Sequence, residues 1–109
     1  MEDMNAEGHG FTLKLVHLDS KGDVANGVLA VVQAVTQNFS LVLGPAFSGI
    51  TNAASSLTKF YNLPLLSASA TSPTLADKVQ HPTFSRIITA DNLQGGAVAA
   101  MLEHFGTTL

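Results

Sequence analysis

Two groups of small hydroxyl-bearing residues in this 109-residue sequence have the chemistry to bind a small polar molecule. One is the run SASATS at residues 67–72, in which Ser69 and Thr71 stand two apart and would project to the same side of an extended chain. Small side chains let a ligand approach the backbone, and hydroxyl groups both donate and accept hydrogen bonds. The plainer interpretation of this run is an ordinary Ser/Thr-rich loop.

The other candidate is Ser48, which follows Gly44-Pro45-Ala46-Phe47 where a helix is expected to begin. The start of a helix directs unpaired amide N–H groups and a positive dipole end outward, and the Ser48 hydroxyl adds one more donor. That arrangement suits a carboxylate or another anion. The competing interpretation, which the residues alone favour, is that Ser48 caps its own helix.

The segments expected to position these residues alternate between strands and helices. Strand character comes from short apolar runs that end at turn-forming residues, such as SLVLG before Pro45. A run that is apolar throughout is typical of a parallel strand covered on both faces. The predicted strands span residues 11–18, 40–44, 63–66 and 84–88.

Three helices are expected between and after these strands, because apolar residues recur at helical spacing. Asp23 is expected to cap the first, while Asp91 and Gln94 form a capping pair for the last, which Gly106 should stop. A short helical or turn segment is predicted at residues 73–78. The second helix is expected to begin at Phe47 or Ser48. The predicted buried stripes are Val24, Val28, Val31, Val32 and Val35 in the first helix, Ile50, Ala53, Ala54, Leu57, Phe60 and Tyr61 in the second, and Leu93, Ala97, Ala100, Met101 and His104 in the third.

This alternation predicts a three-layer α/β fold with a mostly parallel sheet and right-handed crossovers. In open sheets of this kind, ligands bind at the carboxyl ends of the strands, where Asp19-Ser20, residues 44–49 and residues 67–72 all fall. Turn chemistry accounts fully for Asp19 and Ser20. Residues 1–5 look like the end of a helix, and the sequence closes just after another helix, so it is expected to be a fragment.

Composition argues against several other classes of protein. The five basic residues are scattered, so no phosphate-tracking patch forms and nucleic acid is not an expected partner. Apolar stretches are far shorter than the ~20 residues that span a bilayer, and the amino-terminal residues lack the pattern of a secretory signal. There are no cysteines, which excludes disulfides and thiolate chemistry.

Catalytic and metal-binding patterns are also missing from the sequence. No serine lies in a G-x-S-x-G elbow, and residues 44–49 lack the Lys-Ser/Thr ending of a phosphate-binding loop. The histidines His9, His17, His81 and His104 show no ligand spacing, so each is interpreted as a surface or strand-face residue. We therefore expect no catalytic residue, no metal and no cofactor.

Four segments, taken in order, resemble a known family: LDSKGD (residues 18–23), LVLGPAFS (41–48), NLPLLSASATSPTLADK (62–78) and PTFSRIITAD (82–91), followed by Gln94. They are similar to the ligand-binding region of the type I periplasmic-binding-protein superfamily. That superfamily includes bacterial branched-chain amino-acid binding proteins and the extracellular domains of class C G-protein-coupled receptors, natriuretic peptide receptors and ionotropic glutamate receptors. The resemblance runs from about Met1 through Leu109.

The resemblance implies a two-lobed clamshell, or Venus flytrap, in which a small ligand binds between the lobes and closure transmits a signal or enables delivery. Residues 1–109 would then form a partial first lobe, without its first strand, the second lobe or the effector domain. It further implies a location on the extracellular face of a membrane receptor, or in the periplasm or outside the cell. A homodimer through the helices at residues 24–39 and 49–61 is also implied, although core burial explains their apolar stripes equally well.

Carried over to this sequence, the family pattern assigns ligand contacts to a small set of residues. Ser48 matches the serine that binds the α-carboxylate of the ligand, while Ser69 and Thr71 match the pair that contacts the carboxylate and α-amino group. Ala70 and Phe47 complete the expected ligand-binding set. Phe47 departs from the small or serine-rich residues common in this loop among amino-acid receptors, and its bulk could crowd the carboxylate site.

These observations favour a non-enzymatic ligand-binding domain for an amino acid or a similar small zwitterion. One alternative is a small α/β enzyme domain that binds an anionic substrate at the helix start of Ser48. Another is a degenerate fragment without a ligand. A partial lobe would leave strand edges and one sheet face uncovered, so the isolated chain is expected to associate.

Overall fold

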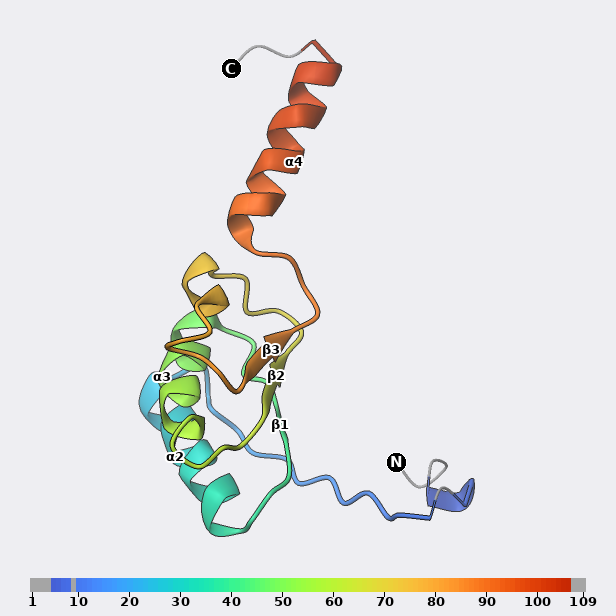
Figure 1. Cartoon of the computed structure of the whole chain (residues 1–109), viewed down its shortest axis with the longest axis vertical. Coiled ribbons are helices and arrows are strands. Elements are labelled where there is room, and N and C mark those ends of the chain that lie inside the picture. Colours follow the sequence, from blue (N-terminus) through green and yellow to red (C-terminus); the bar gives the residue numbers. More distant parts are fainter. Residues whose placement is uncertain (1–4, 9, 107–109) are drawn as a thin grey trace.

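The computed structural model describes residues 5–8 and 10–106 of the chain. The elements, in order, are α2 (Val24–Thr36), β1 (Val42–Leu43), α3 (Ser48–Thr58), β2 (Leu65–Ser67), the 3₁₀ helix η1 (Pro73–Ala76), β3 (Phe84–Arg86) and α4 (Asp91–His104). Figure 1 shows their arrangement. The predicted alternation of strands and helices is confirmed from α2 onward, with strands shorter than predicted.

The three strands form one parallel sheet in the order β1-β2-β3. Leu65 of β2 is the central residue, because it pairs with Val42 on one side and with Phe84 on the other. Since the strands are parallel and in sequence order, the loops that follow them emerge at the same edge of the sheet. The α/β class with a parallel sheet is therefore confirmed, and this edge is the place to look for a site.

Helices α2 and α3 lie side by side and cover one face of this sheet (Figure 1). The core between the helices and the sheet contains Val31, Ala54, Leu65, Ala70, Leu75 and Phe84, all buried. The described elements thus supply the sheet and one helical layer of the three-layer arrangement expected from the sequence. No helix in the described ranges is long and apolar enough to cross a membrane.

The inner face of α2 differs from the predicted valine stripe. Its buried residues are Gly27, Val31 and Ala34, whereas Val24 and Val32 are exposed. The reason is close packing: a Cβ atom added to Gly27 would lie 2.2 Å from Cγ2 of Ile50 on α3. Because Gly27 has no Cβ, the two helices can approach closely at this point.

Gly27→Ala is therefore expected to destabilise the protein, even though alanine favours helix formation by ~1 kcal/mol over glycine. Forcing the added methyl group against Ile50 costs about 1–3 kcal/mol, as overpacking in cores usually does. Urea denaturation of the intact protein that carries this chain measures the net change. Gly95→Ala is the control, because its added Cβ meets no atom within 4 Å, and it should leave stability unchanged or raise it. A Gly27→Ala protein as stable as Gly95→Ala would contradict this packing.

The buried face of α3 combines the predicted Ile50 and Ala54 with three hydroxyl residues, Thr51, Ser55 and Thr58. Their hydroxyls donate to helix carbonyls three or four residues earlier, so burial leaves no polar atom unsatisfied. The prediction that Phe60 and Tyr61 belong to this face is wrong, since both are exposed. Helix α3 ends at Thr58, and the turn that follows directs the chain into β2.

The predicted strand at residues 11–18 is wrong. The backbone there is irregular and belongs to no strand of the sheet. The side-chain amide of Asn5 anchors this segment, because it donates to the Leu13 carbonyl at 3.1 Å and accepts from the Leu13 N–H at 2.8 Å. Partial alternation of apolar residues indicated a strand, but a strand requires a neighbouring backbone, and β1 pairs only with β2 in the described residues.

Helix α4 is present as predicted but extends away from the sheet and the other helices (Figure 1). The prediction of a buried stripe on α4 is wrong, because none of its residues is buried and Leu93 and Met101 are exposed. The predicted capping pair is also wrong: Ala90 is the N-cap, and the Gln94 side chain donates to the Thr89 carbonyl at 2.7 Å instead. Gly106 ends the helix with a positive φ of 68°, as predicted.

Two expectations fall partly outside the described ranges. The helix end predicted at residues 1–5 is described only from Asn5 onward, and His9 lies outside the described residues.

The predicted cap of α2 is confirmed: the Asp23 side chain accepts a hydrogen bond from the Asn26 N–H at 3.0 Å. Asp19 accepts from the Lys21 N–H at 2.8 Å, so turn chemistry accounts for it too.

Candidate functional site

The loops that follow β1 and β2 are joined by side-chain hydrogen bonds at the carboxyl edge of the sheet. Ser67 donates through its Oγ to the Pro45 carbonyl at 2.7 Å. Ser69 donates through its Oγ to the Ala46 carbonyl at 3.1 Å. The two segments singled out in the sequence are therefore adjacent in space, and the hydroxyls of Ser67 and Ser69 contribute to holding them together.

Ser48 does not cap its helix. The N-cap of α3 is Phe47, in extended conformation and without a side-chain capping bond, and Ser48 is the first helical residue. The Ser48 Oγ instead accepts a hydrogen bond from the Ser72 N–H at 3.1 Å. A hydroxyl that accepts one hydrogen bond still has its own proton to donate, and that proton has no acceptor among the described residues.

The first turn of α3 offers further donors beside this hydroxyl. The earliest amide of the helix with an acceptor is Thr51, which donates to the Phe47 carbonyl at 2.9 Å, so the N–H groups of Ser48, Gly49 and Ile50 remain unpaired in the described structure. No acidic residue lies in this turn. Together with the helix dipole, these donors favour a negatively charged group.

Thr71 is the second residue with unused donors. It is half-buried, and its carbonyl accepts from the Asp91 N–H at 3.0 Å. Neither its N–H nor its hydroxyl has a partner among the described residues. Thr71 and the start of α3 are linked through Ser72, whose N–H reaches Ser48. The geometry thus brings Ser48 and Thr71, both predicted from the sequence, to one place.

The other three predicted residues have different surroundings. Ser69 is exposed, with its hydroxyl donating to Ala46. Ala70 is fully buried; its N–H donates to the Ser67 Oγ at 3.1 Å and its carbonyl accepts from Arg86, so it lies beneath the loop. Phe47 is 64% exposed at the rim, next to Gly22 of the turn before α2.

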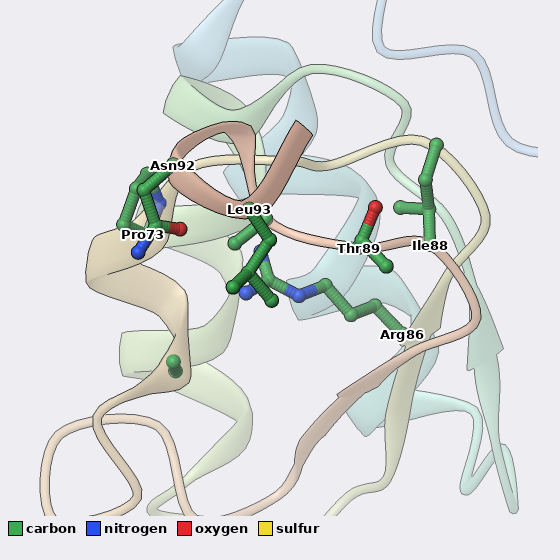
Figure 2. Close-up of a pocket in the computed structure, with 8 residues that line it drawn as sticks. Pro73, Arg86, Ile88, Thr89, Asn92 and Leu93 are labelled. Carbon is green, nitrogen blue, oxygen red and sulfur yellow. The ribbon is translucent and has the colours of Figure 1, made fainter. Parts of the chain in front are cut away.

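Arg86 is a residue of this region that sequence reasoning missed. It is the last residue of β3, and its Nη1 donates to the Ala70 carbonyl at 3.2 Å and the Ser72 carbonyl at 2.8 Å. The available signal was a single cationic residue in the otherwise apolar and hydroxyl-bearing run FSRIITA. Arg86 also lines a pocket of about 400 Å³ between η1 and the start of α4, shown in Figure 2. That pocket does not include Ser48, Ser69 or Thr71.

A serine and a histidine meet further along α3, two turns after its start. Ser55 Oγ and His81 Nδ1 lie 2.6 Å apart, and both residues are buried. The expectation that His81 is a surface or strand-face residue is therefore wrong. The Ser55 hydroxyl donates its one proton to the Asn52 carbonyl at 3.0 Å, so in the contact with His81 the Nδ1–H is the donor and Ser55 Oγ the acceptor. Because the pair is enclosed, its role is to join α3 to the segment before β3.

The arrangement at the sheet edge supplies hydroxyl and amide donors from two loops, at the start of α3 and at Thr71. Among the described residues, no group of three His, Asp or Glu side chains is placed to hold a metal ion.

Several known proteins are similar in sequence to this chain. Residues 1–108 match the protein family described as the receptor family ligand binding region. The chain is 33% identical to gamma-aminobutyric acid type B receptor subunit 2 of Rattus norvegicus over 97 residues, which are 87% of this chain and 10% of the receptor subunit. It is 32% identical to glutamate receptor 3.4 of Arabidopsis thaliana over 109 residues, covering 97% of this chain and 11% of that receptor.

A third relative is the metabotropic glutamate receptor-like protein E of Dictyostelium discoideum, 30% identical over 83 residues, or 76% of this chain and 10% of that protein. The chain spans about a tenth of the length of these curated relatives. The similarity therefore covers a ligand-binding portion of much longer proteins.

Proposed function

The chain belongs to the receptor family ligand binding region, and from this premise we propose that the carboxyl edge of its sheet binds a small amino acid. The family is periplasmic-binding-protein-like and consists of ligand-binding domains, not of enzymes. The single observation that carries the proposal is the convergence of unused donors at Ser48 and Thr71, which Ser72 links directly. A zwitterion has the matching groups, because its carboxylate accepts hydrogen bonds and its ammonium needs hydroxyl or carbonyl oxygens.

In the proposed complex, the ligand carboxylate lies at the start of α3. It accepts hydrogen bonds from the Ser48 hydroxyl and from the unpaired amides of the first helical turn, where the dipole is positive. Thr71 binds from the opposite loop through its N–H and hydroxyl. The Thr71 hydroxyl oxygen can also accept from the ammonium group, so this one residue can contact both charged ends of a small ligand.

The relatives suggest which amino acids to test. Their names specify gamma-aminobutyric acid and glutamate, which share a carboxylate and an amino group. Phe47 stands at the rim of this site with most of its surface exposed. We infer that it restricts the space beside the carboxylate and so selects among such ligands.

Ser69 and Phe47, beside the proposed site, are exposed, so a further protein surface is needed to remove the ligand from water. We propose that residues 1–109 form part of the first lobe of a two-lobed receptor on the outside of a membrane, and that a second lobe closes over Ser48 and Thr71. Exposed apolar residues on α2 and in the turn after α3, namely Leu29, Phe60 and Tyr61, are the proposed contacts with a second protomer. Alanine replacement of all three should convert a dimer to a monomer in sedimentation, and an unchanged dimer would exclude this surface.

Titration calorimetry of the intact protein that carries this chain tests the proposed function. We expect saturable binding of gamma-aminobutyric acid, L-glutamate or L-leucine, and roughly tenfold weaker binding by Thr71→Val, which keeps the side-chain shape but loses a hydroxyl bonded to a charged group. Thr36→Val is the matched control, since its hydroxyl donates to the Gln33 carbonyl at the end of α2.

Absence of binding for all three amino acids, or equal affinity of the Thr71→Val and wild-type proteins, would rule out the proposed site. Turnover of an anionic substrate would favour the alternative of a small α/β enzyme domain. The family assignment already counts against that alternative, because it places the chain among ligand-binding regions.

A further inference from the structure

The loop that carries Thr71 is held from below by one side chain. Arg86 Nη1 donates to the carbonyls of Ala70 and Ser72, at 3.2 and 2.8 Å, and these carbonyls flank Thr71 on either side. Carbonyls two residues apart face the same direction in an extended chain, so a single guanidinium nitrogen with two hydrogens can bind both. Figure 2 shows the Arg86 side chain extended from β3 along the pocket that Pro73 and Leu93 also line.

Two more contacts complete the restraint on this loop. The Thr71 carbonyl accepts from the Asp91 N–H at 3.0 Å, and the Ser72 N–H donates to the Ser48 Oγ at 3.1 Å. Three consecutive peptide groups are thus tied to β3, to the start of α4 and to the start of α3. The N–H and hydroxyl of Thr71 are what this set of contacts leaves unbonded.

Arginine is suited to this role for physical reasons. Its guanidinium is always charged and planar, and hydrogen bonds from a charged donor are about twice as strong as neutral ones. Both of its acceptors among the described residues are backbone carbonyls, so the side chain holds the loop rather than forming an ion pair. Its positive charge, in contact with the carbonyls on either side of Thr71, also favours an anionic ligand bound at this loop.

We propose that Arg86 is a positioning residue of the amino-acid site: it acts on the ligand through Ala70 and Ser72 by fixing the orientation of Thr71 and of the Ser48–Ser72 hydrogen bond. This inference rests on the proposed function. It predicts that the ligand-free loop is already in its binding geometry, so that little order has to be gained on binding.

The experiment compares Arg86→Met, Arg86→Lys and Lys78→Met in the intact protein. Methionine keeps an unbranched apolar stem but has no donor, whereas lysine keeps the charge without the planar fork. Lys78→Met is the matched control, because Lys78 also donates from a cationic side chain to a carbonyl of β3, that of Phe84, but away from the loop. Two readouts are used: amide hydrogen exchange without ligand, and titration with gamma-aminobutyric acid and L-glutamate.

For Arg86→Met, we expect the exchange of the Ser72 amide to rise by about tenfold relative to that of the core amide of Leu65, which donates to Thr83. Binding should weaken by about tenfold, the amount expected for loss of a charge-assisted hydrogen bond. Arg86→Lys should recover part of both effects. Lys78→Met should change neither the Ser72-to-Leu65 exchange ratio nor the affinity for the amino acid, even where it lowers overall stability.

The proposal is overturned if Arg86→Met retains wild-type affinity and a wild-type Ser72-to-Leu65 exchange ratio, or if Lys78→Met alters both as much as Arg86→Met does. Failure of the proposed function is seen separately, as the absence of saturable binding in the wild-type protein. The exchange ratio measures the clamp without any ligand, so the two failures are distinguishable.

Discussion

Ser48→Ala is expected to weaken amino-acid binding by roughly 10- to 100-fold, the largest effect of any single hydroxyl in the chain. The substitution removes the donor that lies nearest the positive end of α3 and is free to bind a carboxylate. It also leaves the Ser72 N–H without its acceptor, which loosens the loop of Thr71. Titration calorimetry of the intact protein gives the change in affinity.

The matched control for this prediction is Ser56→Ala. Ser56 is exposed on the same helix, and its hydroxyl donates to the Asn52 carbonyl, so its loss should leave affinity unchanged. A second comparison uses the methyl ester of the bound amino acid, which lacks the charged carboxylate. The wild-type protein should bind the ester much more weakly, and Ser48→Ala should discriminate less between acid and ester. Equal discrimination in both proteins would show that the carboxylate lies elsewhere.

Phe84→Ala is expected to produce the largest loss of stability, about 3–5 kcal/mol, the usual cost of truncating a buried aromatic side chain. Phe84 is 1% exposed and pairs with Leu65 across the sheet, where the core is formed. A loss of this size approaches the whole stability of a small domain. Chemical denaturation of the intact protein measures it.

Ile87→Ala serves as the comparison for Phe84→Ala. Ile87 is close in sequence, just beyond β3, but 78% exposed, so its truncation should change the free energy of unfolding by less than about 0.5 kcal/mol. Similar losses for the two variants would mean that the core described here is not the one that stabilises the protein.

The sequence was sufficient to predict the order of elements from α2 to α4 because each leaves a local signal. Asp23 marks the start of α2, Pro64 precedes β2, and Gly106 ends α4. The predictions failed where a neighbour decides the outcome. Residues 11–18 alternate like a strand but have no strand beside them, and the inner face of α2 is set by the contact of Gly27 with Ile50 rather than by its valines.

The same distinction applies to the candidate site. Ser48 and Thr71 were found from residue type, position at strand ends and family resemblance, and the structure adds that Ser72 joins them. Arg86 was missed because its role depends on two carbonyls 14 and 16 residues earlier in the chain. The burial of His81 was missed because nothing in its local sequence indicates its hydrogen bond with Ser55, 26 residues away.

The most direct test of the account is to map the bound amino acid onto the backbone by the chemical shifts of the amides in the intact protein. We predict that saturation with the binding amino acid shifts the amides of Ser48, Gly49, Ile50 and Thr71 most, because these N–H groups are unpaired without ligand. Shifts concentrated instead around the pocket of Thr89, Asn92 and Leu93, with the amides of Ser48 and Thr71 unmoved, would contradict the proposed site.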